Sequence, residues 1–382
     1  MPFIFNVVTG RKKASGGGGG GGGSTPVPRN LAAGQGHSLY VENTGVSWTW
    51  GLNNAGQLGD NSITNRCTPV SVLGESKTFC QITAGWSHIV AIDKNGRAWA
   101  WGAGGSGQLG NNSTASQTTP VSVLGATKTF CKIGSGNYHT VAIDKNGQAW
   151  TWGQNNFGQL GDNTTAQRLT PVSVLGATKT FCQISAGYYH SLAIDKNGRA
   201  WAWGYNRRGQ LGNSSTIVKY TPVSVCGAPK TFCQIDAGQE HHSVAIDKNG
   251  QAWAWGQNGY GALGNNGFAS ETTPVSVCGA PKTFCQISAG YYYNLAIDKN
   301  GLAWAWGYNA FGQLGDNSTI SKRTPVSVLG ATKTFCQICA GDYHSLAVDN
   351  NGLVWSWGYN YFGQLGDNTT TSRITPVRVC NL

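Results

Sequence analysis

One hairpin-forming segment recurs seven times along this chain and constrains its fold more than any other feature. In its clearest copy, residues 186–204, a glycine turn precedes two alternating apolar runs that are joined by Asn197 and Gly198. Such an Asn-Gly pair predicts a β-hairpin, because the primed turn needs positive φ at both central residues. The glycine that ends the second run recurs at Gly51, Gly102, Gly153, Gly204, Gly256, Gly307 and Gly358.

The spacing of these glycines predicts a repeat architecture. Every step is 51 residues except one of 52, whose extra residue lies within residues 240–242. A full unit, residues 170–216, contains four strand-like runs, Pro-Val-Ser-Val, Thr-Phe-Cys-Gln-Ile, Ser-Leu-Ala-Ile and Ala-Trp-Ala-Trp, and no helical period. Four strands repeated seven times predict an all-β chain, folded as a seven-bladed β-propeller of about 51-residue four-stranded repeats.

The two ends of the repeat region suggest how the ring closes. The first unit lacks the usual strand before its glycine, and the chain finishes on residues 375–379, a lone copy of that strand. We therefore expect the C-terminal strand to join the N-terminal blade. Such a strand would close the ring and leave no bare sheet edge.

The repeated motifs resemble those of a known family. The units contain close variants of Gly-x-x-His-Ser-Leu-Ala, then Asn-Gly-x-x-Trp-x-Trp-Gly-x-Asn, then Gly-Gln-Leu-Gly. This series resembles the regulator of chromosome condensation repeat family, whose members form seven-bladed β-propellers, and it covers residues 25–382. The resemblance implies the fold more directly than the function, because propellers host unrelated activities.

The first 24 residues differ from the repeats. A short apolar run is followed by Arg11, Lys12 and Lys13 and then by glycines 16–23. The run is too short to span a bilayer, and its charges follow it, unlike those of a secretory signal. We expect an anchor peptide (1–15) that pairs with a protein partner by strand addition, a polyglycine linker (16–24) and the propeller (25–382); a disordered tail is the alternative to the anchor. The anchor residues are Phe3, Ile4, Phe5, Val7 and Val8.

Charges are few and their balance is positive. Only 11% of the residues are charged, and the net charge is +11. We interpret the lysines spread over the units as aids to solubility that protect strand edges, the alternative being a ring-shaped attraction for polyanions. Since residues 11–13 form the one dense basic cluster, we do not expect nucleic acid as a partner. An uncharged polar surface favours an extracellular or particle-surface location, with an intracellular one as the alternative.

Fourteen of the fifteen tryptophans form Trp-x-Trp pairs, one pair in each unit. Residues i and i+2 of a strand share a face, so the two rings of a pair point the same way. Burial of all fourteen would contribute roughly 70 kcal/mol before entropy is counted, so we predict that they form the core between blades rather than a stacking platform. The pairs are Trp48 and Trp50, Trp99 and Trp101, Trp150 and Trp152, Trp201 and Trp203, Trp253 and Trp255, Trp304 and Trp306, and Trp355 and Trp357.

A histidine recurs near the start of six units, with Asn294 assigned to the remaining one. Equivalent positions in different blades are too far apart to share one metal ion. The family resemblance implies a structural role, in which the histidine ties the turn after the glycine to a neighbouring strand. The six are His37, His88, His139, His190, His242 and His344.

Two further recurrent features are also interpreted as structural. Asp-Lys-Asn-Gly lacks the ligand spacing of a calcium loop and is predicted to be a hairpin turn. The mid-strand cysteines are expected to be small buried hydrophobes, with cross-strand disulfides of Cys226 with Cys233 and Cys278 with Cys285 as an open alternative. These cysteines are Cys80, Cys131, Cys182, Cys233, Cys285 and Cys336.

No catalytic grouping interrupts the repeats, so we expect a protein that is not an enzyme and that uses no cofactor or metal. A binding site in a ring of near-copies should lie where one unit departs from the others. The candidate binding-loop residues are Trp86, Arg207, Arg208, Glu240, His241 and Phe268.

Two functions follow from these observations. The uniform repeats, low charge and N-terminal leash favour a structural or adhesive propeller that is tethered to a larger assembly, such as a virion, tail or surface appendage, and presents its loops to a protein or glycan. The family resemblance implies the alternative, a guanine nucleotide exchange factor for a small GTPase with a chromatin-binding tail. Members with that activity carry an inserted wedge in one blade, whereas every period here is 51 or 52 residues.

Overall fold

A computed structural model describes residues 30–74, 78–125, 129–176, 180–227, 231–279, 283–329 and 334–382. The expected anchor peptide and polyglycine linker lie outside these ranges. Throughout the described chain the secondary structure is β, with 28 strands in seven four-stranded antiparallel sheets. The prediction of an all-β, seven-bladed propeller is therefore confirmed.

The blades follow one another in chain order. Blade 1 contains β1 (Asn30–Ala33), β2 (His37–Val41), β3 (Ser47–Gly51) and β4 (Arg66–Ser71). Blade 2 contains β5 (Phe79–Ala84), β6 (His88–Asp93), β7 (Ala98–Gly102) and β8 (Gln117–Ser122), and blade 3 contains β9 (Phe130–Ser135), β10 (His139–Asp144), β11 (Ala149–Gly153) and β12 (Arg168–Ser173). Blade 4 contains β13 (Phe181–Ala186), β14 (His190–Asp195), β15 (Ala200–Gly204) and β16 (Lys219–Ser224), and blade 5 contains β17 (Phe232–Ala237), β18 (His242–Asp247), β19 (Ala252–Gly256) and β20 (Glu271–Ser276). Blade 6 contains β21 (Phe284–Ala289), β22 (Tyr293–Asp298), β23 (Ala303–Gly307) and β24 (Lys322–Ser327), and blade 7 contains β25 (Phe335–Ala340), β26 (His344–Asp349), β27 (Val354–Gly358) and β28 (Arg373–Arg378).

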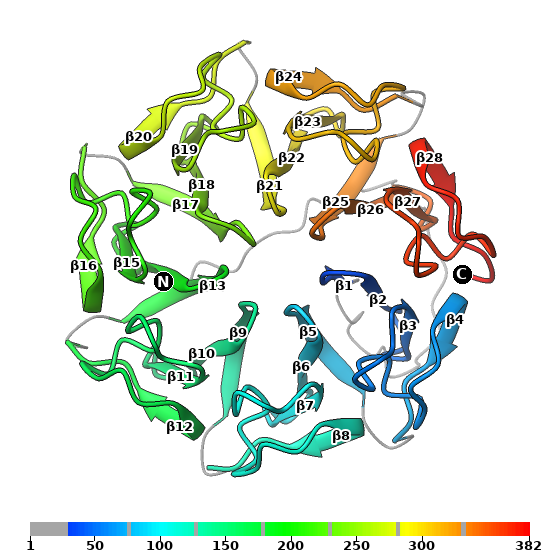
Figure 1. Cartoon of the computed structure of the whole chain (residues 1–382), viewed down its shortest axis with the longest axis horizontal. Coiled ribbons are helices and arrows are strands. Elements are labelled where there is room, and N and C mark those ends of the chain that lie inside the picture. Colours follow the sequence, from blue (N-terminus) through cyan, green and yellow to red (C-terminus); the bar gives the residue numbers. More distant parts are fainter. Residues whose placement is uncertain are drawn as a thin grey trace, which may run out of the picture.

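The blades form a ring around a central channel (Figure 1). The first strand of each blade lines the channel and the fourth lies at the rim (Figure 1). Because neighbouring strands are antiparallel, the turns after the first strands and the long loops after the third strands emerge at one end, which we call the loop face. The tight turns between the second and third strands emerge at the opposite end, the hairpin face.

The expected mode of ring closure is wrong. The strand that contains residues 375–378 is β28, and it pairs with β27 of its own blade, with Trp355 opposite Arg378. Blade 1 has its own fourth strand, β4, which pairs with β3. A sequence period gives the length of a unit but not the strand at which a blade begins. Each Pro-Val-Ser strand in fact completes the blade that precedes it along the chain.

The ring closes instead through the same contacts that join every other pair of blades. The indole nitrogen of Trp50 in blade 1 donates to the carbonyl oxygen of Gln364 in blade 7 at 2.9 Å. The Ser38 hydroxyl donates to the same carbonyl at 2.8 Å, and His344 Nε2 lies 2.8 Å from that hydroxyl. Apolar side chains of blades 1 and 7, among them Leu31 and Leu346, share one buried cluster. No exchanged strand is needed.

The two tryptophans of each pair have different surroundings. The first ring is half-buried beside the interblade core, and the indole nitrogen of Trp99, for example, donates to Asp93 Oδ2 at 3.0 Å. The other carboxylate oxygen of Asp93 accepts from the amides of Asn95 and Arg97, as expected for a hairpin turn. The second rings have no exposed surface: Trp50, Trp101, Trp152, Trp203, Trp255, Trp306 and Trp357.

The recurrent histidines tie neighbouring blades together, as expected. His139 Nε2, for example, lies 2.9 Å from Ser191 Oγ on the second strand of the next blade. Burial lowers the pKa of His139 to about 3, so its ring is neutral at pH 7. The assignment of Asn294 to the histidine position is wrong: Tyr293 pairs with Gly307 where His190 pairs with Gly204, so Tyr293 takes the place of the histidine.

The histidine of blade 1 lacks this link. Ile89 takes the place of the serine in blade 2 and offers no hydroxyl. His37 is consequently fully buried, with neither ring nitrogen hydrogen-bonded among the described residues.

The cysteines differ from expectation. Cys131, Cys182, Cys285 and Cys336 are exposed rather than buried, because the strand alternates its side chains and the preceding Phe points into the core. None of the eleven cysteines, all within the described residues, forms a disulfide, so the cross-strand disulfides are absent from this structure.

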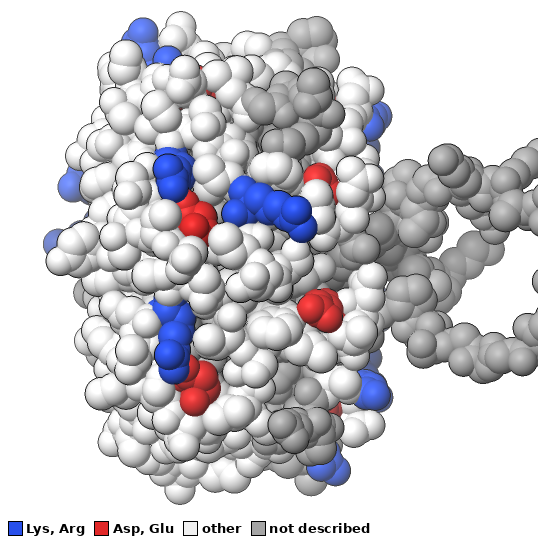
Figure 2. Space-filling model, turned by 90° about the vertical axis from the view of Figure 1, so that its right-hand side faces the viewer, with Lys and Arg blue, Asp and Glu red and all other residues white. Residues whose placement is uncertain are grey.

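Charged side chains are sparse on the side of the ring seen in Figure 2, and several basic groups there lie directly against acidic ones. Among the described residues, ion pairs of this kind include Arg66 with Asp60 at 2.9 Å and Arg373 with Asp367 at 2.8 Å. No helix in the described chain is long and apolar enough to cross a membrane.

The last glycine of each Gly-Gln-Leu-Gly loop packs on the buried tryptophan of the next blade, and this contact is testable. Gly161 has φ +68°, and a Cβ there would lie 2.9 Å from the Trp203 ring. We expect Gly161→Ala to lower the free energy of unfolding by about 2 kcal/mol or more, from the strained φ and the clash together. Urea unfolding would measure this change.

Gly105→Ala is the matched control, because a Cβ there meets no atom within 4 Å. Its unfolding free energy should stay within about 0.5 kcal/mol of the parent chain. Equal stability of the two variants would contradict the importance of the contact.

Candidate functional site

The loop face carries a nearly continuous series of aromatic side chains. They come from two places in the repeat, the turn after the first strand and the loop after the third. Neighbouring ring centroids lie 4.0 to 6.5 Å apart, within or close to the usual range of aromatic pairs. We call this series the aromatic arc: Trp86, Tyr138, Phe157, Tyr188, Tyr189, Tyr205, Tyr260, Tyr291, Tyr292, Tyr308, Phe311, Tyr343, Tyr359, Tyr361 and Phe362.

The one extra residue of the repeat joins the two halves of the arc. His241 lies 4.9 Å from Tyr205 and 6.0 Å from Tyr188, measured between ring centroids. Its neighbour Glu240 accepts hydrogen bonds through Oε1 from the hydroxyls of Tyr291 at 2.8 Å and Tyr292 at 3.1 Å. The 52-residue unit therefore supplies the polar junction between the aromatic residues of blades 2–4 and those of blades 5–7.

A ring of seven residues surrounds the channel mouth at this face. They directly follow the turn glycines, and backbone hydrogen bonds link several of them to the next blade, such as the Asp342 amide to the Gly34 carbonyl at 3.2 Å. From blade 2 to blade 7 large aromatic and buried polar side chains alternate. We call these residues the mouth ring: Gln35, Trp86, Asn137, Tyr188, Gln239, Tyr291 and Asp342.

The polar members of the mouth ring are buried without full hydrogen bonding. Asn137 is 1% exposed, Asp342 2% and Gln239 7%. Among the described residues, both polar side-chain atoms of Asn137, Gln239 Oε1 and Asp342 Oδ2 have no hydrogen-bond partner. Leaving such atoms unpaired costs about 1–3 kcal/mol each, so the fold sacrifices stability at this place.

The charges of the mouth act on one another. Burial, helped by the charge of Glu240, raises the pKa of Asp342 to about 7. Burial also raises the pKa of Tyr292 to about 12, with contributions from the charge and hydrogen bond of Glu240. The Asp342 carboxylate adds to the raised pKa of Tyr138 and Tyr343, in blades 3 and 7. Groups from distant parts of the sequence therefore converge at the mouth.

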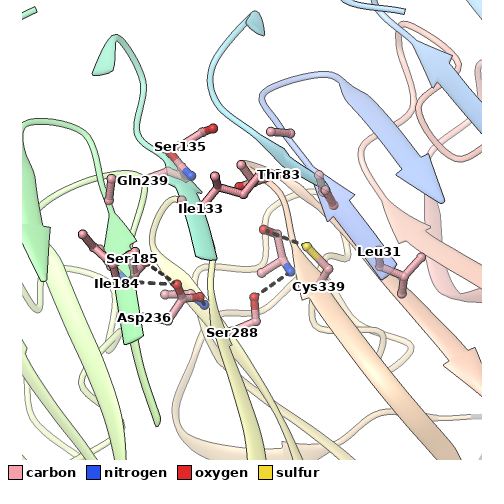
Figure 3. Close-up of a pocket in the computed structure, with 18 of the residues that line it drawn as sticks. Leu31, Thr83, Ile133, Ser135, Ile184, Ser185, Asp236, Gln239, Ser288 and Cys339 are labelled. Atoms are coloured by element: carbon pink, nitrogen blue, oxygen red, sulfur yellow. Dashed lines mark hydrogen bonds between the residues drawn. The ribbon is translucent and has the colours of Figure 1, made fainter. Parts of the chain in front are cut away.

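Below the mouth the channel contains a cavity of about 170 Å³, lined by small and aliphatic residues of the first strands (Figure 3). Asp236 lines the cavity, and both of its carboxylate oxygens accept hydrogen bonds. Oδ1 accepts from the Ser185 hydroxyl at 2.7 Å (Figure 3), and Oδ2 accepts from the Ala289 amide at 2.9 Å. Burial raises the pKa of Asp236. Gln239 lies at the junction of cavity and mouth. No cluster of three potential metal ligands occurs in the described part of the chain.

The structure brings together three of the six candidate binding-loop residues. Trp86, Glu240 and His241 all contact the aromatic arc. Arg207 and Arg208 are exposed in the β15–β16 loop of the same face.

Phe268 stands apart from the arc, in the β19–β20 loop. It is 60% exposed, and the guanidinium of Arg323 lies 5.1 Å from its ring centroid.

Sequence reasoning missed most of the arc and all of the buried polar groups. The tyrosines occur in several units, whereas the sequence analysis looked for residues that differ in one unit only. It therefore did not select them. A sequence pattern could have found them, because aromatic residues are enriched at repeat positions outside the histidine, serine and tryptophan links between blades. These positions are the two residues after the turn glycine and the residue after Trp-Gly. That the alternating members of the mouth ring meet around one opening follows only from the closed ring.

Comparisons with known proteins agree with this geometry. The profile of the RCC1-like domain matches residues 22–334, and profiles of the regulator of chromosome condensation (RCC1) repeat match residues 335–364 and 351–382. The ultraviolet-B receptor UVR8 of Arabidopsis thaliana is 27% identical over 352 residues, which are 91% of this chain and 80% of the receptor. The E3 ubiquitin-protein ligase HERC2 of Homo sapiens is 28% identical over 349 residues, 88% of this chain but only 7% of the ligase.

Solved structures show the same fold. Prp20p from Saccharomyces cerevisiae superposes with a TM-score of 0.78, covering 91% of this chain and 86% of the yeast chain at 22% identity.

The buried Asp342 carboxylate, whose Oδ2 has no hydrogen-bond partner among the described residues, leads to a testable prediction about stability. Its pKa is about 7 in the folded chain and 3.8 without the fold, so the native state holds this proton more tightly. The stability that it contributes is complete below pH 3.8 and is lost as the pH rises through 7. We expect Asp342→Asn to raise the unfolding free energy at pH 8 by on the order of 3 kcal/mol and to change it little at pH 4. Urea unfolding at both pH values measures the difference.

Asp162→Asn is the matched control, since hydrogen bonds from Thr164, Arg168 and Asn155 outweigh burial and lower the pKa of Asp162. This variant should lose stability at pH 8. If Asp342→Asn also lost stability at pH 8, the Asp342 carboxylate would have a favourable partner and would not destabilise the fold.

Proposed function

Because the chain belongs to the RCC1-like propeller family, we propose that it is a non-enzymatic binding protein whose loop face engages a protein partner. The observation that carries this proposal is the aromatic arc, which extends over six of the seven blades. Tyrosine and tryptophan are the residues most enriched where proteins bind one another, because each offers a large rigid apolar surface with a polar tip. The arc is also half-buried rather than fully packed, and Tyr361 is 68% exposed.

The loops that carry the arc are built to hold their shape, which lowers the entropic cost of binding. In each of several blades one asparagine organises the loop. Asn309 donates through Nδ2 to Asp316 Oδ1 at 3.0 Å, while its Oδ1 accepts from the Leu314 amide at 2.9 Å. The same arrangement occurs around Asn53 and Asn360. The arc is thus presented on a preorganised surface.

The test compares the two faces of the ring. The immobilised full chain should retain a protein partner from an extract of the source organism, and Tyr260→Ser combined with Tyr361→Ser should weaken that retention at least tenfold. Both tyrosines are well exposed, at 43% and 68%, so the variant should fold. Lys94→Ser combined with Lys196→Ser on the hairpin face is the matched control and should retain the partner fully. Undiminished binding by the tyrosine variant, or loss only in the lysine variant, would overturn the proposal, as would retention of a glycan alone.

We further propose that residues 1–24 attach the propeller to a larger assembly, such as a virion, tail or surface appendage. The support is the sequence itself, a β-prone apolar peptide followed by a glycine linker. Light scattering of the full chain beside a version that begins at Ser24 tests this role. We expect large particles, or docking to the parent assembly, for the full chain and a monomer for the shortened one. Monomers in both cases would remove the anchor.

A further inference from the structure

Two carboxylates at the channel mouth differ from the other acids described above. The acids of the long loops form ion pairs, and those of the hairpin turns accept indole and amide hydrogens. By contrast, Asp342 Oδ2 and Glu240 Oε2 are buried and accept no hydrogen bond within the described residues. His241 Nε2 lies 3.1 Å from Glu240 Oε2. Burial lowers the pKa of His241 more than the charge of Glu240 raises it, and Arg208 lowers it further, so at neutral pH His241 is mostly the uncharged imidazole.

Aromatic side chains lie around these carboxylates, and two of them, Tyr291 and Tyr292, donate their hydroxyls to Glu240. Trp86 of blade 2 reaches across blade 3 to Tyr188 of blade 4, with ring centroids 6.1 Å apart, and both residues belong to the mouth ring. On the other side Tyr291 and Tyr343 approach to 5.1 Å. The negative faces of aromatic rings attract a cation, and a nearby carboxylate adds its charge where it is ionised, which for Asp342 means above about pH 7.

We propose that the mouth binds a lysine or arginine side chain of the protein partner, with Asp342 and Glu240 as counter-charges and the tyrosines as walls. This inference rests on the proposed binding role of the loop face and names the chemistry that the partner must present. The argument is charge complementarity: in a chain of net charge +11, two acids are left without cationic partners at one opening. An entering cation would provide the missing donors, and its aliphatic stem would lie along the rings.

The unpaired amide groups nearby support the same occupant. Within the described residues, Asn137 Oδ1 and Gln239 Oε1 are buried acceptors without donors, and Asn137 Nδ2 is a buried donor without an acceptor. Both residues belong to the mouth ring. A guanidinium carries five N–H donors and an ammonium three, so either can satisfy several acceptors at once. An anionic or purely apolar group would leave all of these oxygens unpaired.

The experiment uses the full chain and two peptides that differ only in charge. Acetyl-Gly-Arg-Gly-amide is titrated against acetyl-Gly-citrulline-Gly-amide, and binding is followed by the NMR signal of the Trp86 indole. We expect saturable binding of the arginine peptide and at least about tenfold weaker binding of the citrulline peptide. Asp342→Asn should weaken arginine binding by a similar factor while remaining folded and more stable at pH 8. Loss of affinity therefore cannot be ascribed to unfolding.

Glu271→Gln is the matched control, since it removes one negative charge from β20 at the rim (Figure 1). Its arginine affinity should not change. Equal binding of the two peptides, or equal losses in Asp342→Asn and Glu271→Gln, would overturn the inference.

The partner assay separates this inference from the proposed function. If the partner is still lost in the Tyr260 and Tyr361 double variant while the arginine peptide shows no preference over citrulline, the binding role stands and the cation site fails. If the partner is retained by that variant, the proposed function fails whichever peptide binds.

Discussion

The structure depends on one hydrogen-bonded link that is repeated around the ring. The indole nitrogen of each fully buried tryptophan donates to a backbone carbonyl in the loop of the preceding blade, as Trp203 does to Gln159 at 2.9 Å. The same carbonyl accepts the Ser191 hydroxyl at 2.8 Å, so that hydroxyl oxygen is left to accept from His139 Nε2. The carbonyl accepts from two side chains of the next blade, and the serine hydroxyl links the histidine to the same network. Because blades 7 and 1 are joined in the same way, the ring closes without an exchanged strand.

Because only some positions of each repeat form these links, the side chains at the other positions can vary. Glycine, histidine, serine and the second tryptophan are committed to the interface between blades. The residues just after the turn glycine and after Trp-Gly are not, and these positions carry the aromatic arc. Even the interface tolerates a missing link, as His37 shows: Ile89 offers it no hydroxyl, and neither of its ring nitrogens is hydrogen-bonded to a described residue. The tryptophan link itself is present at all seven interfaces.

The channel mouth contains side chains that lower the stability of the fold. The buried side-chain atoms of Asn137, Gln239 and Asp342 that lack a partner among the described residues are unfavourable for folding. Only the backbone amides of these residues link neighbouring blades. Their position beneath the aromatic arc makes them part of the surface that a partner would meet. A binding role accounts for both features, because a bound cation would donate to the unpaired oxygens and balance the charge of the two carboxylates.

The sequence by itself determined the number of blades, the composition of their strands, the hairpin turns and the structural role of the histidines. These follow from local periodicity and turn chemistry, which are the same in every unit. It could not determine which strand begins a blade, and so the expected closure by residues 375–379 was wrong. Nor could it show that Trp86, Tyr188, Glu240 and Asp342 meet, because only the rotation between successive blades brings residues about 51 positions apart to one opening. Only the tertiary structure shows that tyrosines far apart in the sequence lie beside these two acids and form a candidate site.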